Sequence, residues 1–213
     1  MSKPPHRGAA APVVRAAASR GVRAAIAALA LAVCGGGALA QGAERLVRGQ
    51  IGLGITGGGD KLATVQWSNG DATNINAGGQ IDLRGGVDVQ LGDSPFTVQA
   101  SVEWFVQRAN GTNGSVTFDR FPLELMGTWS LADAFRLEAG VRRAGNGKLE
   151  GRGAASNIGS STFKSKLGAV VEGEWLFGGL YGLALRAVSE EYEAPNGEKV
   201  DGSHVGLRFS LYF

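Results

Sequence analysis

The chain is poor in the residues that build disulfides and metal centres. It has one cysteine, Cys34, and only one histidine, His204, beyond the N-terminal segment. A lone thiol closes no disulfide within the chain, and one histidine without cysteine supplies no zinc cluster. No apolar run after residue 40 approaches the ~20 residues that a transmembrane helix needs. We therefore expect residues 41–213 to carry no disulfide, metal centre or cofactor, and no helical membrane anchor.

The first forty residues are basic and then apolar. The basic part holds Lys3, Arg7, Arg15, Arg20 and Arg23 without an acid. A short apolar core, Ala24–Cys34, and the small-residue step Ala38-Leu39-Ala40 follow. This order predicts a cleaved signal peptide over residues 1–40 and a single domain over residues 41–213. Acylation at Cys34 is the alternative, but Val33 is bulkier than a lipoprotein site prefers.

The net positive charge of the chain belongs to this segment. Without it the chain keeps sixteen basic and nineteen acidic residues. The sequence pI of about 8.8 therefore gives no reason to expect nucleic-acid binding.

A two-residue period dominates what remains. In His204–Phe213 every second residue is apolar, from Val205 through Phe209 to Phe213, and the residues between are polar or small. Such alternation predicts a strand with one apolar and one polar face. Eight segments show it: 48–56, 75–91, 96–108, 116–130, 135–142, 163–177, 181–190 and 204–213. We predict an all-β domain of eight antiparallel strands.

The connections between these segments alternate in length. Gly92–Pro95, Leu131–Ala134 and Gly178-Gly179 are short, whereas 57–74, 109–115, 143–162 and 191–203 are longer and mostly polar. Aromatic residues flank the short turns: Phe96, Trp129, Phe135, Trp175, Phe177 and Tyr181, with Phe213 at the same end. Aromatic rings favour the headgroup zone of a bilayer, so these residues predict an aromatic girdle. Trp104, Phe121, Phe163 and Tyr192 would form a second girdle.

These features together resemble the small eight-stranded outer-membrane β-barrels of bacteria, the OmpA/OmpX type. The resemblance implies an up-and-down transmembrane barrel in the outer membrane, in contact with its lipids. It also implies that the C-terminal strand, through Phe209, Leu211 and Phe213, is the signal that the barrel-assembly machinery reads. Periodicity alone leaves open a soluble barrel with its apolar face turned inward.

In the membrane reading, the polar faces of the strands line the lumen. The predicted lumen charge network is Asp82, Arg84, Glu103, Glu124, Arg136, Glu138, Arg142, Lys164, Lys166, Glu172, Glu174, Arg186 and Arg208. With Asp88, Arg120 and Glu190 this face holds eight acids and eight bases. Equal numbers favour a closed, salt-bridged interior, because an ion-selective pore would carry an excess of one sign.

Three motifs suggest chemistry and are set aside. Gly52–Gly57 matches G-x-G-x-x-G but lies inside a strand with no helix after it, so we expect small lumen residues there. Ser94 precedes a proline in a short turn and has no base beside it. His204 shares the inward parity of Arg208, which favours a structural role over catalysis.

We therefore predict a non-enzymatic barrel with a structural or surface-interaction role through its long loops. A small passive pore and a lipid-modifying enzyme are the alternatives, and the sequence names no loop partner.

Overall fold

The computed structural model describes residues 46–66, 72–111 and 113–213. The predicted signal peptide lies outside these residues. The strands are β1 (Val47–Gly58), β2 (Lys61–Gln66), β3 (Ala72–Asn76), β4 (Ile81–Gln90), β5 (Phe96–Asn110), β6 (Gly114–Arg120), β7 (Leu123–Ala132), β8 (Phe135–Arg143), β9 (Asn146–Gly153), β10 (Ser160–Ser165), β11 (Leu167–Phe177), β12 (Tyr181–Ser189), β13 (Glu191–Glu193), β14 (Lys199–Asp201) and β15 (His204–Tyr212). One 3-10 turn, η2, spans Ser156–Ile158.

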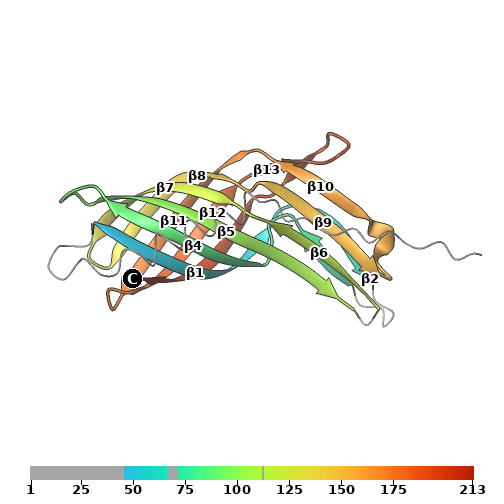
Figure 1. Cartoon of the computed structure of the whole chain (residues 1–213), viewed down its shortest axis with the longest axis horizontal. Coiled ribbons are helices and arrows are strands. Elements are labelled where there is room, and N and C mark those ends of the chain that lie inside the picture. The colour runs from blue at the N-terminus through green and yellow to red at the C-terminus, as the bar shows by residue number, and fades with distance from the viewer. Residues whose placement is uncertain (1–45, 67–71, 112) are drawn as a thin grey trace, which may run out of the picture. The chain divides into compact units, whose positions relative to one another are not determined.

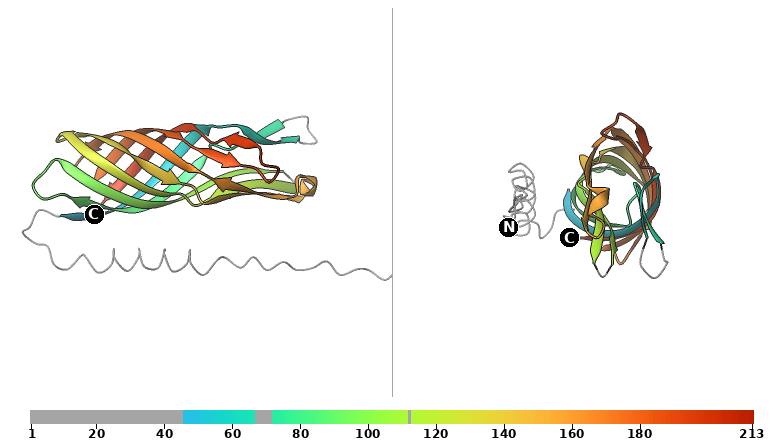
Figure 2. Two further views of the ribbon diagram at one scale, coloured as in Figure 1. Left: turned by 90° about the horizontal axis from the view of Figure 1, so that it is seen from above. Right: turned by 90° about the vertical axis from the view of Figure 1, so that its right-hand side faces the viewer.

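Eight of these strands form a closed antiparallel barrel, which confirms the predicted fold (Figures 1 and 2). Around the wall the order is β1, β4, β5, β7, β8, β11, β12 and β15, and β15 pairs again with β1. The last residue completes the closure, since Gly49 N donates to Phe213 O at 2.8 Å and Phe213 N donates to Gly49 O at 3.0 Å. In the described part of the chain, no helix is long and apolar enough to cross a membrane.

The outer face of the barrel is apolar. Leu53, Leu125, Leu185 and Val205 are each more than half exposed, and the polar residues between them point inward. A closed barrel leaves no unpaired backbone edge, so such a surface can face lipid on all sides.

The six residues of the predicted aromatic girdle lie on the outer face, at the end with the short turns. Phe96, Trp129, Phe135, Trp175, Phe177 and Tyr181 are all at least 40% exposed. Several rings touch: Phe96 and Trp129 stack at 6.1 Å between centroids, and Phe177 and Tyr181 at 5.7 Å. The turn beneath them places Gly178 and Gly179 at φ 62° and 67°, which favours glycine at both positions of a two-residue hairpin turn.

At the opposite end the strands continue beyond the barrel, where the sequence predicts polar loops. We call this part the extension: strands β2, β3, β6, β9, β10, β13 and β14 together with the upper end of β5. Seven of its connections to the barrel break the strand pattern, as at Phe121-Pro122 and Ala144-Gly145, whereas β5 runs unbroken for 15 residues. The loop predicted at 143–162 is thus mostly a β9–β10 hairpin.

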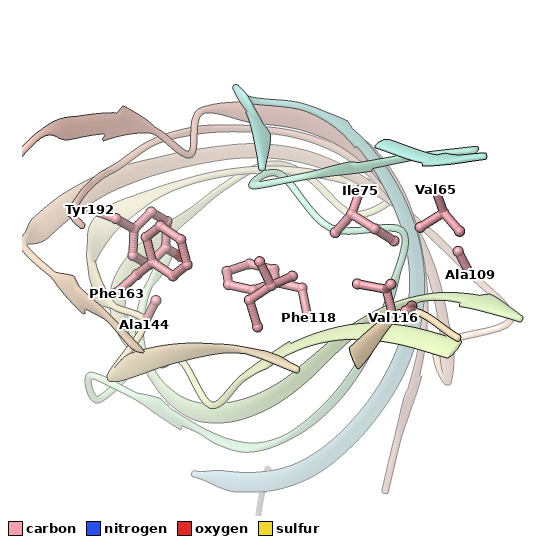
Figure 3. Packing of buried hydrophobic residues seen from close by; sticks show 10 residues of the cluster. Val65, Ile75, Ala109, Val116, Phe118, Ala144, Phe163 and Tyr192 are labelled. Atoms are coloured by element: carbon pink, nitrogen blue, oxygen red, sulfur yellow. The ribbon is translucent and has the colours of Figure 1, made fainter. Parts of the chain in front are cut away.

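The extension has an apolar core of its own (Figure 3). Its buried members are Val65, Ile75, Ala109, Val116, Phe118, Ala144, Leu149, Ala155, Phe163 and Tyr192. Phe118 lies in the middle and meets Phe163 and Tyr192 edge to face, at 6.0 and 6.3 Å between centroids. The second aromatic girdle is therefore corrected: Trp104 and Phe121 point outward, but Phe163 and Tyr192 are core residues. Ile75 and Ala77, at the start of the predicted segment 75–91, are also fully buried, although the alternation of that segment places them on its apolar face.

Candidate functional site: the charged lumen

The lumen of the barrel is filled by arginine and carboxylate side chains. Fourteen of them are buried to 5% exposure or less: Asp82, Arg84, Asp88, Glu103, Arg120, Glu124, Arg136, Glu138, Arg142, Glu172, Glu174, Arg186, Glu190 and Arg208. They come from β4, β5, β6, β7, β8, β11, β12 and β15 and from the step after β12, because inward positions recur every second residue. Their ion pairs divide into two groups that share no member.

The upper group, nearer the extension, is balanced. It joins five arginines (Arg84, Arg120, Arg142, Arg186 and Arg208) to five acids (Asp82, Glu103, Glu124, Glu172 and Glu190). Burial of a charge in a narrow interior is tolerated only when its partners are close and well placed. The equal numbers of arginines and acids in the upper group meet this requirement.

Glu103 is the hub of the upper group. Its carboxylate lies 2.8 Å from Arg186 Nη1 and 3.3 Å from both Arg84 Nε and Arg142 Nη1. Arg208 Nη2 also donates to it. Four guanidinium groups, from β4, β8, β12 and β15, therefore converge on one carboxylate of β5 and cross-link the barrel wall.

The lower group, nearer the short turns, is not balanced. One fully buried arginine, Arg136, pairs with three acids: Asp88 (3.3 Å), Glu138 (3.0 Å) and Glu174 (2.6 Å). The Tyr212 hydroxyl donates to Glu174 Oε1 at 2.8 Å and accepts from Arg136. At the mouth the half-exposed Arg48 reaches Asp88 at 3.9 Å and lies over the Tyr212 ring.

Two members of the predicted network are wrong. Lys164 and Lys166 lie on the outer face of the wall, where Lys166 Nζ pairs with Glu191 at 2.5 Å. The alternation is interrupted at Lys166-Leu167, where two successive residues point outward. As a result the odd-numbered residues face inward in β10 and the even-numbered residues face inward in β11. The expected balance of eight and eight is corrected accordingly: the buried lumen holds eight acids and six arginines. The other eleven predicted members all lie in the lumen.

A short segment, which we call the cap, lies in the lumen on the side of the extension. Ala77, Gly78 and Gly79 turn inward and are buried, and the Ala77 carbonyl accepts a hydrogen bond from Arg120 Nη1. Thr56 Oγ1 donates to the Gly78 carbonyl at 2.9 Å. A Cβ at Gly79 would come within 2.8 Å of the Phe105 ring, so only glycine lets this cap pack so closely. The two-residue alternation of the sequence did not predict that this segment turns into the lumen.

His204 supports this cap from below. It is 3% exposed, its Nδ1 lies 2.8 Å from the Gly202 carbonyl, and its ring meets Phe105 at 5.4 Å between centroids. The predicted inward direction is confirmed. A lipid-modifying site would need this imidazole on the lipid face, which it does not reach.

The G-x-G-x-x-G run is part of the lumen wall, as expected. A Cβ at Gly52 would stand 3.2 Å from Arg208 Cδ, so the missing side chain makes room for the arginine. Gln50 and Gln99 are lumen residues that charge counting overlooked; both are 1% exposed. Their inward parity is the signal that could have identified them.

This arrangement defines a class of protein. An apolar lipid-facing wall without edges, an aromatic girdle and a charged interior together are the features of a small transmembrane β-barrel of the bacterial outer membrane. The protein is such a barrel, and membrane lipid is what its outer face contacts.

No protein-family model matches the chain. No curated protein matches it either. Among solved structures it is similar to Ail, the attachment invasion locus protein of Yersinia pestis, which was solved in complex with the heparin analogue sucrose octasulfate. The two chains are 12% identical, with a TM-score of 0.43, and the match covers 78% of this chain and 97% of Ail. It is also similar to the outer membrane channel DcaP of Acinetobacter baumannii (14%, TM-score 0.33, 68% and 42%) and to OmpT, an outer membrane protein of Vibrio cholerae (14%, TM-score 0.28, 80% and 53%). Likenesses this low add nothing about function, and the class rests on the barrel's own geometry.

Proposed function

We propose that this protein is a non-conducting, non-enzymatic barrel that anchors and displays its extension at the cell surface. The observation that carries the proposal is the upper group, in which five arginines and five acids fill the lumen beneath the Ala77–Gly79 cap. An eight-stranded barrel has an interior that side chains nearly fill. A conducting path would have to separate these paired charges, which costs several kcal/mol for each buried ion left alone.

Single-channel recording in planar bilayers tests the proposal. The wild-type barrel should give no steps above the bilayer baseline. Arg120→Ala removes the guanidinium that bonds the cap to the wall, so this variant should show brief openings. Arg108→Ala is the matched control, because Arg108 is exposed on the outer face of β5 and should stay silent. Regular conductance by the wild type would contradict a closed lumen and favour the passive pore.

The extension supports the display role. It is a continuous β-structure with its own apolar core, and its outward face carries polar and charged side chains such as Thr117, Lys148 and Thr162. In outer-membrane barrels the longer connections face outward from the cell and the short turns face the periplasm. A rigid, polar extension on that side is suited to contacts with other surfaces, and the partner is left open.

The C-terminal strand is proposed as the assembly signal. Phe209 and Phe213 are exposed on the lipid face, Leu211 is half-buried beside them, and Phe213 closes the barrel onto Gly49. Phe213→Asp should lower the yield of heat-modifiable, membrane-inserted barrel in cells. Phe96→Asp is the control, since Phe96 is a similarly exposed ring at the same end. Equal losses in both variants would show that only the girdle matters.

A further inference from the structure

The cap is fixed to the barrel wall at Gly78. The backbone N–H of Gly78 donates to the Gly58 carbonyl at 3.2 Å, and its own carbonyl accepts from Thr56 Oγ1 at 2.9 Å. Both partners belong to the upper end of β1, a strand of the closed barrel. This part of the cap therefore moves only if the barrel wall moves.

Ala77, one residue earlier, is held by the β13–β14 hairpin instead. Its N–H donates to the Asp60 carbonyl at 2.8 Å, and Asp60 is joined to Asp201, the last residue of β14, by two hydrogen bonds of 2.7 and 2.8 Å. Its carbonyl accepts from Arg120 Nη1, and Arg120 Nη2 lies 3.2 Å from Glu190, the residue before β13. We call Glu190 and Asp201 the feet of the hairpin. Each backbone group of Ala77 is thus connected to one foot through a single intermediate residue.

The hairpin itself has few bonds to the rest of the wall. Its ladder with β10 contains only two residue pairs, and β14 is the outermost strand of its sheet. Its tip, residues 195–199, is exposed and projects from the side of the extension (Figure 1). Tyr192, between the feet and the tip, is buried in the apolar core of the extension. An element with few ladder bonds is among the first to move, and Tyr192 is the point about which this one can turn.

We propose that the β13–β14 hairpin is a lever that sets the position of Ala77 in the lumen. A partner that seizes the exposed tip turns the hairpin about Tyr192, and the feet then draw Asp60 and Arg120 away from Ala77. Gly78 stays with β1, so the cap bends between these two residues. A contact made at the cell surface is in this way reported inside the barrel. The proposal rests on the outward orientation given to the extension under the proposed function.

The β9–β10 hairpin provides the comparison within the same molecule. It also belongs to the extension, and its η2 turn, Ser156–Ile158, buries none of its residues. Among the described residues, this hairpin makes no hydrogen bond to the cap or to Asp60. A load on its turn should therefore leave Ala77 in place.

Hydrogen exchange of the refolded full barrel under load tests the lever. Asn196→Cys at the tip is coupled to biotin and loaded with streptavidin, in a Cys34→Ser background that removes the only other cysteine. Amide exchange of the peptide containing Ala77 is followed by mass spectrometry. Loss of one hydrogen bond shifts an equilibrium by up to about tenfold, so exchange at Ala77 should rise by up to that factor on loading.

Ser156→Cys with the same biotin and streptavidin is the matched control, and exchange at Ala77 should not change. No change on loading Asn196→Cys, or an equal rise with both loads, would refute the lever. The measurement is made in detergent and reads hydrogen bonds. Its outcome is therefore independent of which way the extension faces in the cell and of whether the lumen conducts.

Two glycine variants test the lever without an added load. Gly197 at the tip of β13–β14 and Gly159 after the η2 turn have φ of 84° and 71°, and a Cβ at either position would meet open space. Valine therefore strains both turns in the same way, through the backbone. Exchange measured by NMR should become faster at Ala77 but not at Gly78 in Gly197→Val, and at neither residue in Gly159→Val. Equal acceleration at Ala77 and Gly78, or unchanged exchange at Ala77 in Gly197→Val, would contradict a lever with one fixed end.

Discussion

Replacing Glu103 by glutamine should be among the most damaging isosteric changes in the barrel. The amide keeps the shape of the side chain but removes the charge that four arginines share. The upper group then holds five arginines and four acids, and one guanidinium stays buried without a counter-charge. Breaking a buried ion pair on one side costs about 3–5 kcal/mol. Because Glu103 has more partners than any other acid in the lumen, we expect the upper part of that range.

The assay is reversible urea unfolding of the refolded barrel, followed by tryptophan fluorescence and by the gel shift of the folded form. Glu138→Gln is the sharp control, since Glu138 belongs to the group with excess acid and has one ion pair, to Arg136 at 3.0 Å. Its loss leaves the lower group balanced when Arg48 is counted, so its cost should stay below about 1 kcal/mol, a typical net value for one hydrogen bond. Similar small losses in both variants would mean that the lumen is wet and its charges are screened.

Three further outcomes follow from the structure. Leu185→Arg places a charge on a lipid-facing side chain that is 64% exposed and should cost about 2–4 kcal/mol in vesicle unfolding, whereas Thr162→Arg on the extension should change little. Phe118→Ala empties the centre of the extension's core and should cost that part about 3–5 kcal/mol, seen as rapid proteolysis of the extension while the barrel fragment stays intact. Gly78→Ala puts a Cβ 2.5 Å from the Gly58 carbonyl oxygen and should unseat the cap, with a loss of about 1–3 kcal/mol and the onset of conductance; an unchanged, silent variant would contradict the packing described here.

The sequence was sufficient for the barrel but not for the extension, and the reason is the change of solvent along each strand. In the membrane the apolar face must point outward, to lipid. Above it the outside is water, so the apolar face must point inward. A two-residue period reports that faces differ and does not report which one is inside.

Individual residues show both forms of this reversal. Along β6 and β7 the inward parity is continuous, and Val116 and Phe118 share it with Arg120 and Glu124; their apolar character at inward positions was the one visible sign of a second core. Between β10 and β11 an extra outward residue shifts the parity instead, which put Phe163 outside and Lys164 inside in the sequence interpretation. The alternation of residue types cannot show where such a shift occurs, because it does not show where β10 ends and β11 begins.

The barrel has an interior of paired charges and the extension has an interior of apolar side chains. The two parts can therefore be changed separately, in evolution and in engineering. A substitution at Val65 or Leu149, unlike one at Tyr192, whose hydroxyl donates to Glu190, leaves the ion pairs of the lumen untouched, so this part of the extension can vary in sequence while the barrel stays intact. The η2 turn at Ser156–Ile158 joins two strands far from the charged lumen and buries none of its own residues. It is therefore the natural place to insert a foreign epitope for display on living cells.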